Sequence, residues 1–384
     1  MFNIPSKIEY VLNCLNDNGY EAYIVGGCVR DMLMGITPHD FDITTSATPE
    51  EIISLFDKTI PTGIKHGTVT VLIDKTPIEV TTFRFEEGYT NHRSPDSVRF
   101  VKNLKEDLSR RDFTVNAMAY NKKLVDYFDG TTDIKNKVLR AVGNPEIRFK
   151  EDSLRILRLF RFASTLSFSI EENTLKSALN EADGLKHISY ERIFQELGKA
   201  VIGENIEALS PLIKNSSLEF LGIKKEPDFI KIKALPKELR LFAFLYLSSD
   251  NILDVLDILK ASNAQKNHAK ALLQLLSDEI PKTKADIKKS LTSKKIYEDY
   301  IQILNCIFGE ETNDIAIMLE EIFDNNEPYL ISHLAIDGNQ LIEKGYKGFE
   351  IGKILNELLN LVIENPTLNT KENLITNLNQ HHRL

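Results

Sequence analysis

The stretch from Tyr23 to Thr45 constrains the fold and the chemistry of this chain more than any other. It opens with apolar residues suited to a buried strand, which Gly26 and Gly27 end in a turn where no Cβ crowds the backbone. We expect a helix to begin near Cys28. Because the first N–H groups of a helix lack partners, the turn would suit a phosphate group, to which Arg30 would add a mobile positive charge.

Two aspartates, Asp40 and Asp42, follow on what we expect to be the next strand. Residues two apart share a face of a strand, so these carboxylates would lie roughly 7 Å apart along the chain, with Phe41 turned toward the core. Such a pair can bind Mg2+, and opposite a phosphate-binding turn it suits two-metal phosphoryl transfer. Either motif alone is common in ordinary turns and solvated strands, but their order within one unit favours the functional interpretation. A dinucleotide-binding fold is disfavoured, because the glycine spacing is G-G-x-x-R instead of G-x-G-x-x-G.

Bulk properties narrow the class of protein. A chain of 384 residues should form two to four domains or one long multi-lobed body, and 42% hydrophobic residues can build proper cores. The three cysteines, Cys14, Cys28 and Cys306, favour neither a disulfide framework nor a zinc site. No signal peptide or long apolar run is visible, so we expect a soluble, cytoplasmic protein without a membrane partner. Because the formal net charge is -9, a polyanionic partner would have to meet a segregated basic surface.

Residues 67–74 and 77–84 have the β-branched composition of two strands and predict a hairpin. Glu79 on the second strand would be a third acidic group near the metals if that strand lay beside the one with the two aspartates. Otherwise it is an ordinary edge charge. Residues 85–100 are polar, with a glycine and a proline, and predict a long mobile loop, a kind of segment that is often functional.

A polar cluster follows in Arg110, Arg111, Asp112, Thr114 and Asn116. Its guanidinium, carboxylate, hydroxyl and amide groups could hold a ribose and a triphosphate, because arginine donates paired N–H bonds to phosphate oxygens. The alternative is a helix N-terminus with surface ion pairs.

The helix expected beyond Phe149 carries a polar row of Asp152, Arg155, Arg158 and Arg161, each three residues from the last. The simplest interpretation is weak ion pairing along the helix. Three arginines with one acid in their row would nevertheless leave positive charge unmatched, which favours an anionic ligand.

An aspartate beside an arginine also suits the pairing edge of a base. Cytosine and adenine present an amino donor beside a ring-nitrogen acceptor, whereas uracil and guanine present a carbonyl beside a ring N–H. Asp152 with Arg155 would therefore accept C and A and refuse U and G, because the wrong base leaves buried polar groups unpaired.

Several motifs in fixed order now support a family assignment. VGGCVRD with DFDITT, then RRDFTVNAMAY, RFKEDSLRILRLFRFAS and SYERIFQEL resemble the motifs of class II tRNA nucleotidyltransferases, which include CCA-adding enzymes and their poly(A) polymerase relatives. Near the C-terminus, AIDGNQLIEKGYKGFEIGKILNELLN is similar to CCA-adding enzymes of low-GC Gram-positive bacteria.

The resemblance implies an α+β fold, with a nucleotidyltransferase head built on a mixed β-sheet and an all-helical neck, body and tail. The implied boundaries are 1–140, 141–200, 201–270 and 271–384. The implied reaction is Mg2+-dependent addition of C, C and A to the 3′ end of tRNA, using CTP and ATP and no nucleic-acid template.

The resemblance also carries roles over to matching positions. Asp40 and Asp42 match the catalytic metal-binding pair. The positions that match nucleotide-binding residues are Gly27, Arg30, Arg111, Asp152, Arg155, Arg158 and Arg161. Asp152 and Arg155 form the implied amino-acid template.

The part of the chain after residue 200 reads as almost wholly helical, for example over 252–259 and 351–363. Lys282 to Lys295 holds six lysines and one acid, which makes this run the best candidate for a tRNA phosphate contact. Narrower alternatives for the activity are A-adding, CC-adding or poly(A) synthesis, and a remote one is a non-catalytic RNA-binding protein. The sequence does not indicate an oligomeric state.

Overall fold

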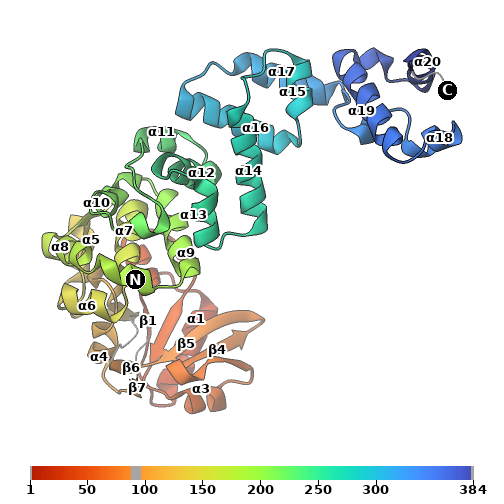
Figure 1. Cartoon of the computed structure of the whole chain (residues 1–384). Helices are drawn as coiled ribbons and strands as arrows, with labels where there is room; N and C mark the ends of the chain where they lie inside the picture. The colour runs from red at the N-terminus through yellow and green to blue at the C-terminus, as the bar shows by residue number, and fades with distance from the viewer. Residues whose placement is uncertain (1, 88–96, 382–384) are drawn as a thin grey trace. The chain divides into compact units, whose positions relative to one another are not determined.

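A computed structural model describes residues 2–87 and 97–381, which form two compact units (Figure 1). One unit runs to Phe229 and includes Phe244–Ala261. The other includes Ile230–Ala243 and the chain from Ser262 onward. The finer division at residues 140, 200 and 270 stays a prediction.

The first unit contains a mixed seven-stranded sheet in the order β3-β4-β5-β2-β1-β8-β9. Neighbouring strands pair antiparallel except β2 and β5, which are parallel. The strand bounds are β1 Ala22–Val25, β2 Asp42–Thr45, β3 Thr59–Gly63, β4 Thr68–Ile73, β5 Thr76–Thr82, β8 Met118–Asn121 and β9 Lys123–Asp126. The predicted hairpin is therefore confirmed as β4 and β5.

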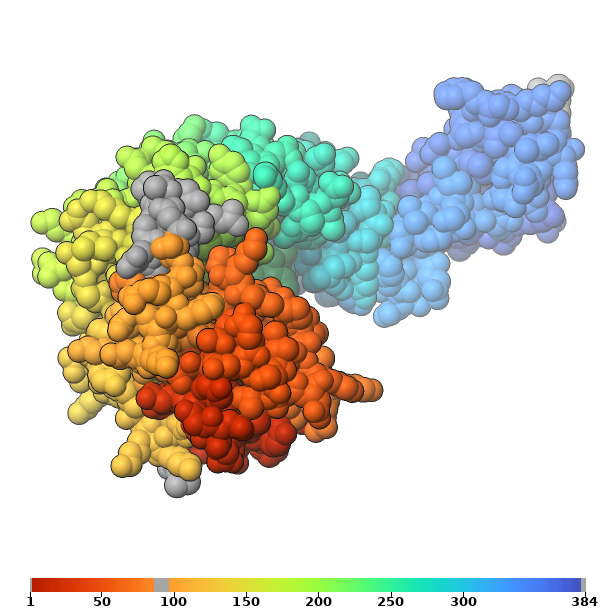
Figure 2. All heavy atoms as spheres, turned by 90° about the horizontal axis from the view of Figure 1, so that it is seen from below, coloured from red at the N-terminus to blue at the C-terminus, as the bar shows by residue number. Residues whose placement is uncertain are grey.

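Alternation along the strands gives the sheet two apolar faces. One face, with Ile43 and Val80, packs against the helices α1 (Ser6–Asp17), α2 (Gly27–Leu33) and α3 (Pro49–Leu55). The other face, with Val25 and Phe83, packs against α4 (Leu104–Ser109). The red atoms of the N-terminal region form part of the outer surface of this unit (Figure 2).

Two strand predictions need correction. Strand β2 begins at Asp42, so Asp40 precedes the strand instead of lying on it. Residues 84–87 and 97–100 form a small antiparallel sheet, β6 (Arg84–Glu87) with β7 (Ser97–Phe100), where a loop was expected. The centre of the predicted mobile loop, 88–96, lies outside the described residues.

The remaining α-helices follow strand β9. The earlier ones are α5 Gly130–Asn136, α6 Pro145–Glu151, α7 Leu154–Leu166, α8 Glu172–Asn180, α9 Tyr190–Val201 and α10 Ser210–Lys214, with a two-stranded pair β10 Val138–Leu139 and β11 Ser169–Ile170. The later ones are α11 Phe229–Ala234, α12 Lys237–Ser248, α13 Ile252–Ile258, α14 Asn263–Ser277, α15 Lys284–Ser290, α16 Lys294–Ile303, α17 Asn313–Asp324, α18 Gly338–Glu343, α19 Phe349–Glu364 and α20 Lys371–His381. Across the described ranges, no helix is both long and apolar enough to cross a membrane.

The helix expected beyond Phe149 is broken, because α6 ends at Glu151 and α7 begins at Leu154. Asp152 lies in the break with extended backbone angles, φ -139° and ψ 100°. Its Oδ1 accepts a hydrogen bond from the Leu154 N–H at 3.1 Å, the short-range bond by which aspartate favours a helix start over a helix interior. The polar row therefore begins outside the helix.

Candidate active site

Asp42 stands at the start of β2, in register with Val25 on β1 and with Glu79 on the parallel strand β5. Paired residues of neighbouring strands point to the same face, so the two carboxylates lie on the face that α4 covers. The strand that carries Glu79 therefore lies beside the strand that carries Asp42, as a third acidic group would require. Within the described residues, however, no group of three histidine, cysteine or acidic side chains is close enough to form a complete metal cage.

The glycine turn brings the backbone close to Asp42 and Arg111. Gly26 has φ +80°, and a Cβ added there would lie 3.2 Å from Arg111 Nη1 and 3.9 Å from Asp42 Oδ2. A side chain at Gly26 would thus occupy the space between a guanidinium and a carboxylate. The family match names Gly27, at which α2 begins, but the close approach belongs to Gly26.

The Asp42 carboxyl has an unusual environment for an exposed residue. Although much of the residue faces solvent, burial of the carboxyl raises its pKa, Arg111 opposes the shift, and Asp40 adds to it. Burial also raises the pKa of the neighbouring Cys28 thiol to about 11, and its Sγ donates to the Val25 carbonyl at 3.1 Å. Cys28 is therefore a packed thiol and not a nucleophile.

Arg30 is fixed, which corrects the expectation of a mobile charge. The residue is buried, its Nη1 donates to Asn116 Oδ1 at 2.7 Å, and its Nε and Nη2 donate to Asp31 Oδ1 at 2.9 and 2.7 Å. Three of its five N–H groups are thus used within the protein. The structure gives Arg30 an anchoring role for the Asn116 segment.

Asp107 is a residue that the sequence prediction missed. It is fully buried and accepts hydrogen bonds from Arg110 Nε at 3.0 Å and Nη2 at 2.8 Å, from Arg111 Nη2 at 3.5 Å, and from Thr44 Oγ1 at 3.2 Å. Burial alone would raise its pKa, but the two arginines lower it. Asp107 therefore holds Arg111 over the strand that carries Asp42.

Asp112 joins the polar cluster to the helix α7. Its Oδ2 accepts from Arg158 Nε at 2.9 Å and Nη2 at 2.6 Å, and its Oδ1 accepts from Asn116 Nδ2 at 3.1 Å. Burial would raise the pKa of this carboxyl, but Arg158, the Asn116 amide and the Phe113 N–H lower it to about 2. The cluster is therefore an internal network and not a set of surface ion pairs.

The arginines of the polar row are matched by acids, against the expectation of unpaired positive charge. Arg155 pairs with Glu151 at 2.8 Å, and Arg158 pairs with Asp112. Arg161 Nε lies 2.9 Å from Glu196 Oε2, an ion pair that lacks hydrogen-bond geometry. Asp112 and Glu196 come from distant segments, which the spacing within the row could not show, whereas Glu151 lies four residues before Arg155.

Among the described residues, the side chains of the two template residues do not bond to each other, although the Arg155 N–H donates to the Asp152 carbonyl at 2.9 Å. Asp152 Oδ2 pairs with Arg192 Nη2 at 3.4 Å. Arg155 Nη1 donates to the Arg148 carbonyl at 3.2 Å and to Glu151, and its Nη2 donates to the Arg110 carbonyl at 2.9 Å. These bonds use three of the five N–H donors of Arg155 and leave two for a ligand.

The lysine run of the second unit is largely neutralised. Its ion-pair partners all lie on other helices or later in the chain, and the pairs are Lys284 with Glu321 and Glu327, Lys288 with Glu327, Lys289 with Glu364, Lys294 with Glu320 and Lys295 with Asp299. Lys288 is only 2% exposed. The run clamps α15 and α16 to their neighbours, and this weakens its case as a phosphate-binding surface.

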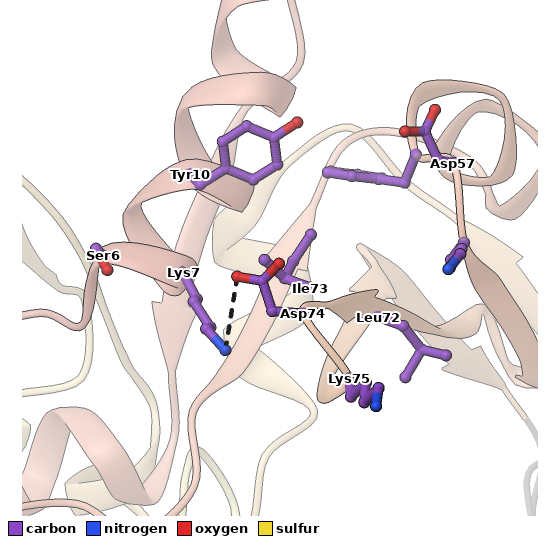
Figure 3. Close-up of a pocket in the computed structure, with 10 residues that line it drawn as sticks. Ser6, Lys7, Tyr10, Asp57, Leu72, Ile73, Asp74 and Lys75 are labelled. Carbon is purple, nitrogen blue, oxygen red and sulfur yellow. Dashed lines mark ion pairs between the residues drawn. The ribbon is translucent and has the colours of Figure 1, made fainter.

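A cavity of about 770 Å3 lies elsewhere in the first unit (Figure 3). It is lined by Ser6, Lys7, Tyr10, Phe56, Asp57, Lys58, Leu72, Ile73, Asp74 and Lys75. Lys7 and Asp74 face one another across it at 3.8 Å. None of the predicted site residues lines this cavity, and its helix α1 packs on the sheet face opposite to Asp42.

The fold and the head geometry define a class. Residues 22–140 match the family model "Poly A polymerase head domain", and residues 167–218 match "Probable RNA and SrmB- binding site of polymerase A". The first unit is thus a nucleotidyltransferase head followed by the helices typical of that class.

Individual relatives narrow the class. The CCA-adding enzyme of Lactobacillus helveticus is 38% identical, with 95% of this chain and 94% of the relative covered. That of Staphylococcus epidermidis is 36% identical, with 99% of each covered. The structure of the Bacillus stearothermophilus CCA-adding enzyme in complex with CTP superimposes with a TM-score of 0.81 at 29% identity, covering 98% of this chain and 97% of that one. The chain belongs to the CCA-adding enzyme family.

Proposed function

We propose that this protein adds C, C and A to the 3′ end of tRNA from CTP and ATP, without a nucleic-acid template and with release of pyrophosphate. The observation that carries this proposal is the meeting of Gly26, Asp42 and Arg111 at one point of a head whose relatives are CCA-adding enzymes along their whole length. A related structure that is named as a CTP complex supports CTP as one substrate. The reaction belongs in the cytoplasm, where tRNA is available.

The residues of the head fit a divalent cation, and we propose Mg2+. Asp40 and Asp42 offer hard carboxylate oxygens, and Glu79 lies in register beside Asp42. Mg2+ usually binds through one or two carboxylates together with substrate phosphates, so an incomplete protein cage suits this ion. When bound there, it would supply the Lewis acid that activates the tRNA 3′-hydroxyl and stabilises the leaving pyrophosphate.

The protein groups position the triphosphate around these carboxylates. The absence of a side chain at Gly26 lets the backbone approach the phosphates, and Arg111, held by Asp107, offers its guanidinium beside Asp42. Arg30 acts indirectly, because it holds Asn116 by a hydrogen bond, and Asn116 in turn donates to Asp112. Positioning and neutralisation of this kind supply most of the catalysis in phosphoryl transfer.

Base choice is proposed to lie with Asp152 and Arg155. The two residues lie three apart at the start of α7, and each keeps hydrogen-bonding capacity after its bonds within the protein are counted. Arg158 and Arg161 lie further along the same helix, where they hold the head segment and α9.

The decisive experiment offers the protein tRNAs that lack CCA, CA or only A, with Mg2+ and with CTP and ATP singly and together. Full CCA addition requires CTP use on the shortest tRNA and ATP use on the tRNA that lacks only A. Addition of A alone would indicate the narrower A-adding activity, and addition of C alone the CC-adding one. An Asp42→Asn protein that still extends tRNA would refute the metal-dependent mechanism.

A further inference from the structure

Helix α9 carries two charged residues that face the polar row of α7. Arg192 and Glu196 are four apart and so lie on one face of the helix. Among the described residues they do not pair with each other. Arg192 instead reaches Asp152, while Glu196 reaches Arg161 at 2.9 Å and Arg158 at 4.0 Å.

We propose that Arg192 is a positioning residue for nucleotide selection, which acts by holding the Asp152 carboxylate in the orientation that accepts the amino group of C or A. This inference rests on the proposed function, in which Asp152 is half of the template. The segment that contains Arg192, SYERIFQEL, has no other assigned part in the reaction.

The need for such a residue follows from the position of Asp152. It lies between α6 and α7 with extended backbone angles, and the backbone bond from the Arg155 N–H to its carbonyl at 2.9 Å does not set the orientation of its side chain. One oxygen, Oδ1, is held by the Leu154 N–H. Without a second contact the carboxylate could rotate about this bond, whereas the Arg192 guanidinium 3.4 Å from Oδ2 fixes the plane of the group.

Asp152 keeps hydrogen-bond acceptors for a base, and the Asp152–Arg192 pair is accessible to a nucleotide. An ionised carboxylate has about four acceptor sites, of which these two bonds use one on each oxygen. An acceptor therefore remains for the amino hydrogen of a base. Arg192 is 31% exposed at its side chain, and Asp152 is 18% exposed, so the pair borders solvent from which a nucleotide can enter.

The Arg192 contact matters for nucleotide selection because it fixes the Asp152 carboxylate before a base binds. Uracil presents a carbonyl oxygen to the carboxylate, and a fixed acceptor rejects it because two acceptors cannot bond. A carboxylate that can turn away avoids this conflict and lets uracil bind with less penalty. Arg192 thus contributes to the refusal of U and G more than to the binding of C and A.

The test compares Arg192→Met, which keeps the length of the side chain but removes the donors, with Arg192→Lys and with the wild type. Lys199→Gln is the matched control, because Lys199 is an exposed cation on the same helix. Incorporation of CTP and UTP is measured on a tRNA that lacks CCA, and equilibrium binding of CTP and UTP is measured without tRNA.

We expect Arg192→Met to reduce the preference for CTP over UTP about tenfold, through a rise in UTP use, while Arg192→Lys recovers most of it and Lys199→Gln leaves it unchanged. Wild-type selectivity in the Arg192→Met protein would overturn the inference, as would an equal loss for both nucleotides. If that variant does not incorporate either nucleotide, the binding ratio decides. A wild-type protein that binds CTP selectively but does not extend tRNA would refute the proposed function instead.

Discussion

Asp42 and Glu79 lie directly beside one another on the parallel strands β2 and β5, with both carboxylates on the sheet face that α4 covers. Glu79 is exposed, and we propose that it acts as a third oxygen ligand or as an outer partner of the proposed cation. Its neutralisation therefore bears directly on cation binding.

Glu79→Gln should lower the rate of nucleotide addition about tenfold and raise the Mg2+ concentration needed for half-maximal activity, because partners of a metal site contribute on this scale. Glu50→Gln, which removes an exposed acid from α3, is the control. A Glu79→Gln protein with an unchanged Mg2+ titration would show that Glu79 is an ordinary edge charge.

Gly26→Ala should cost activity beyond its effect on stability. A residue with φ +80° is strained by about 1–3 kcal/mol when it carries a Cβ, and here that Cβ would also push Arg111. Gly19→Ala separates the two effects, since Gly19 has φ +85° but no atom within 4 Å of the added Cβ. Both variants should lower the Tm, and only Gly26→Ala should raise KM for CTP.

Asp112 should make the first unit sensitive to acid. Its folded pKa, about 2, lies below the unfolded value, so its contribution to the free energy of unfolding is complete above roughly pH 4 and is lost as the pH falls toward 2. The contribution is about 2 kcal/mol by this shift. Urea unfolding of Asp112→Asn should show a loss of this order at pH 7 and little loss at pH 2.5. A loss that does not change with pH would contradict the assignment.

Lys288 should matter for stability and not for tRNA binding. It is buried against Glu327, so Lys288→Ala should destabilise the protein by about 3 kcal/mol in urea unfolding. Lys289→Ala on the same helix removes an exposed pair and should change stability much less.

Two neighbouring lysines, Lys294 and Lys295, test whether the lysine run binds tRNA. Lys294→Gln with Lys295→Gln should leave the affinity for tRNA and its dependence on salt nearly unchanged, because both charges already face acids. A clear decrease in the salt dependence would restore the lysine run as a phosphate contact.

Local patterns predicted local structure well. The strand before Gly26 and the β4–β5 hairpin both follow from residues a few positions apart, and both are confirmed. The family motifs carried over Asp42 and Arg111, which the structure places beside Gly26.

Partners from distant segments were beyond the reach of periodicity. Arg158 and Asp112 are 46 residues apart, so the pattern of arginines on α7 suggested unmatched charge where the fold supplies an acid. The same holds for Lys289 and Lys294, whose acids come from α19 and α17, whereas Lys295 pairs with Asp299 four residues further along its own helix. Asp107 and Arg192 escaped notice because one aspartate or arginine on a helix carries no signal until its neighbours in space are known.

The hydrogen bond from Arg155 Nη2 to the Arg110 carbonyl links two parts of the enzyme that could otherwise change independently. Arg155 belongs to the proposed base reader, while Arg110 precedes the arginine beside Asp42 in the chain. This hydrogen bond therefore couples the proposed selection of the base to the rate of nucleotide addition. A substitution that loosens Arg155 to broaden nucleotide choice will also disturb the phosphate side of the site, so laboratory selection for relaxed specificity should recover slower enzymes.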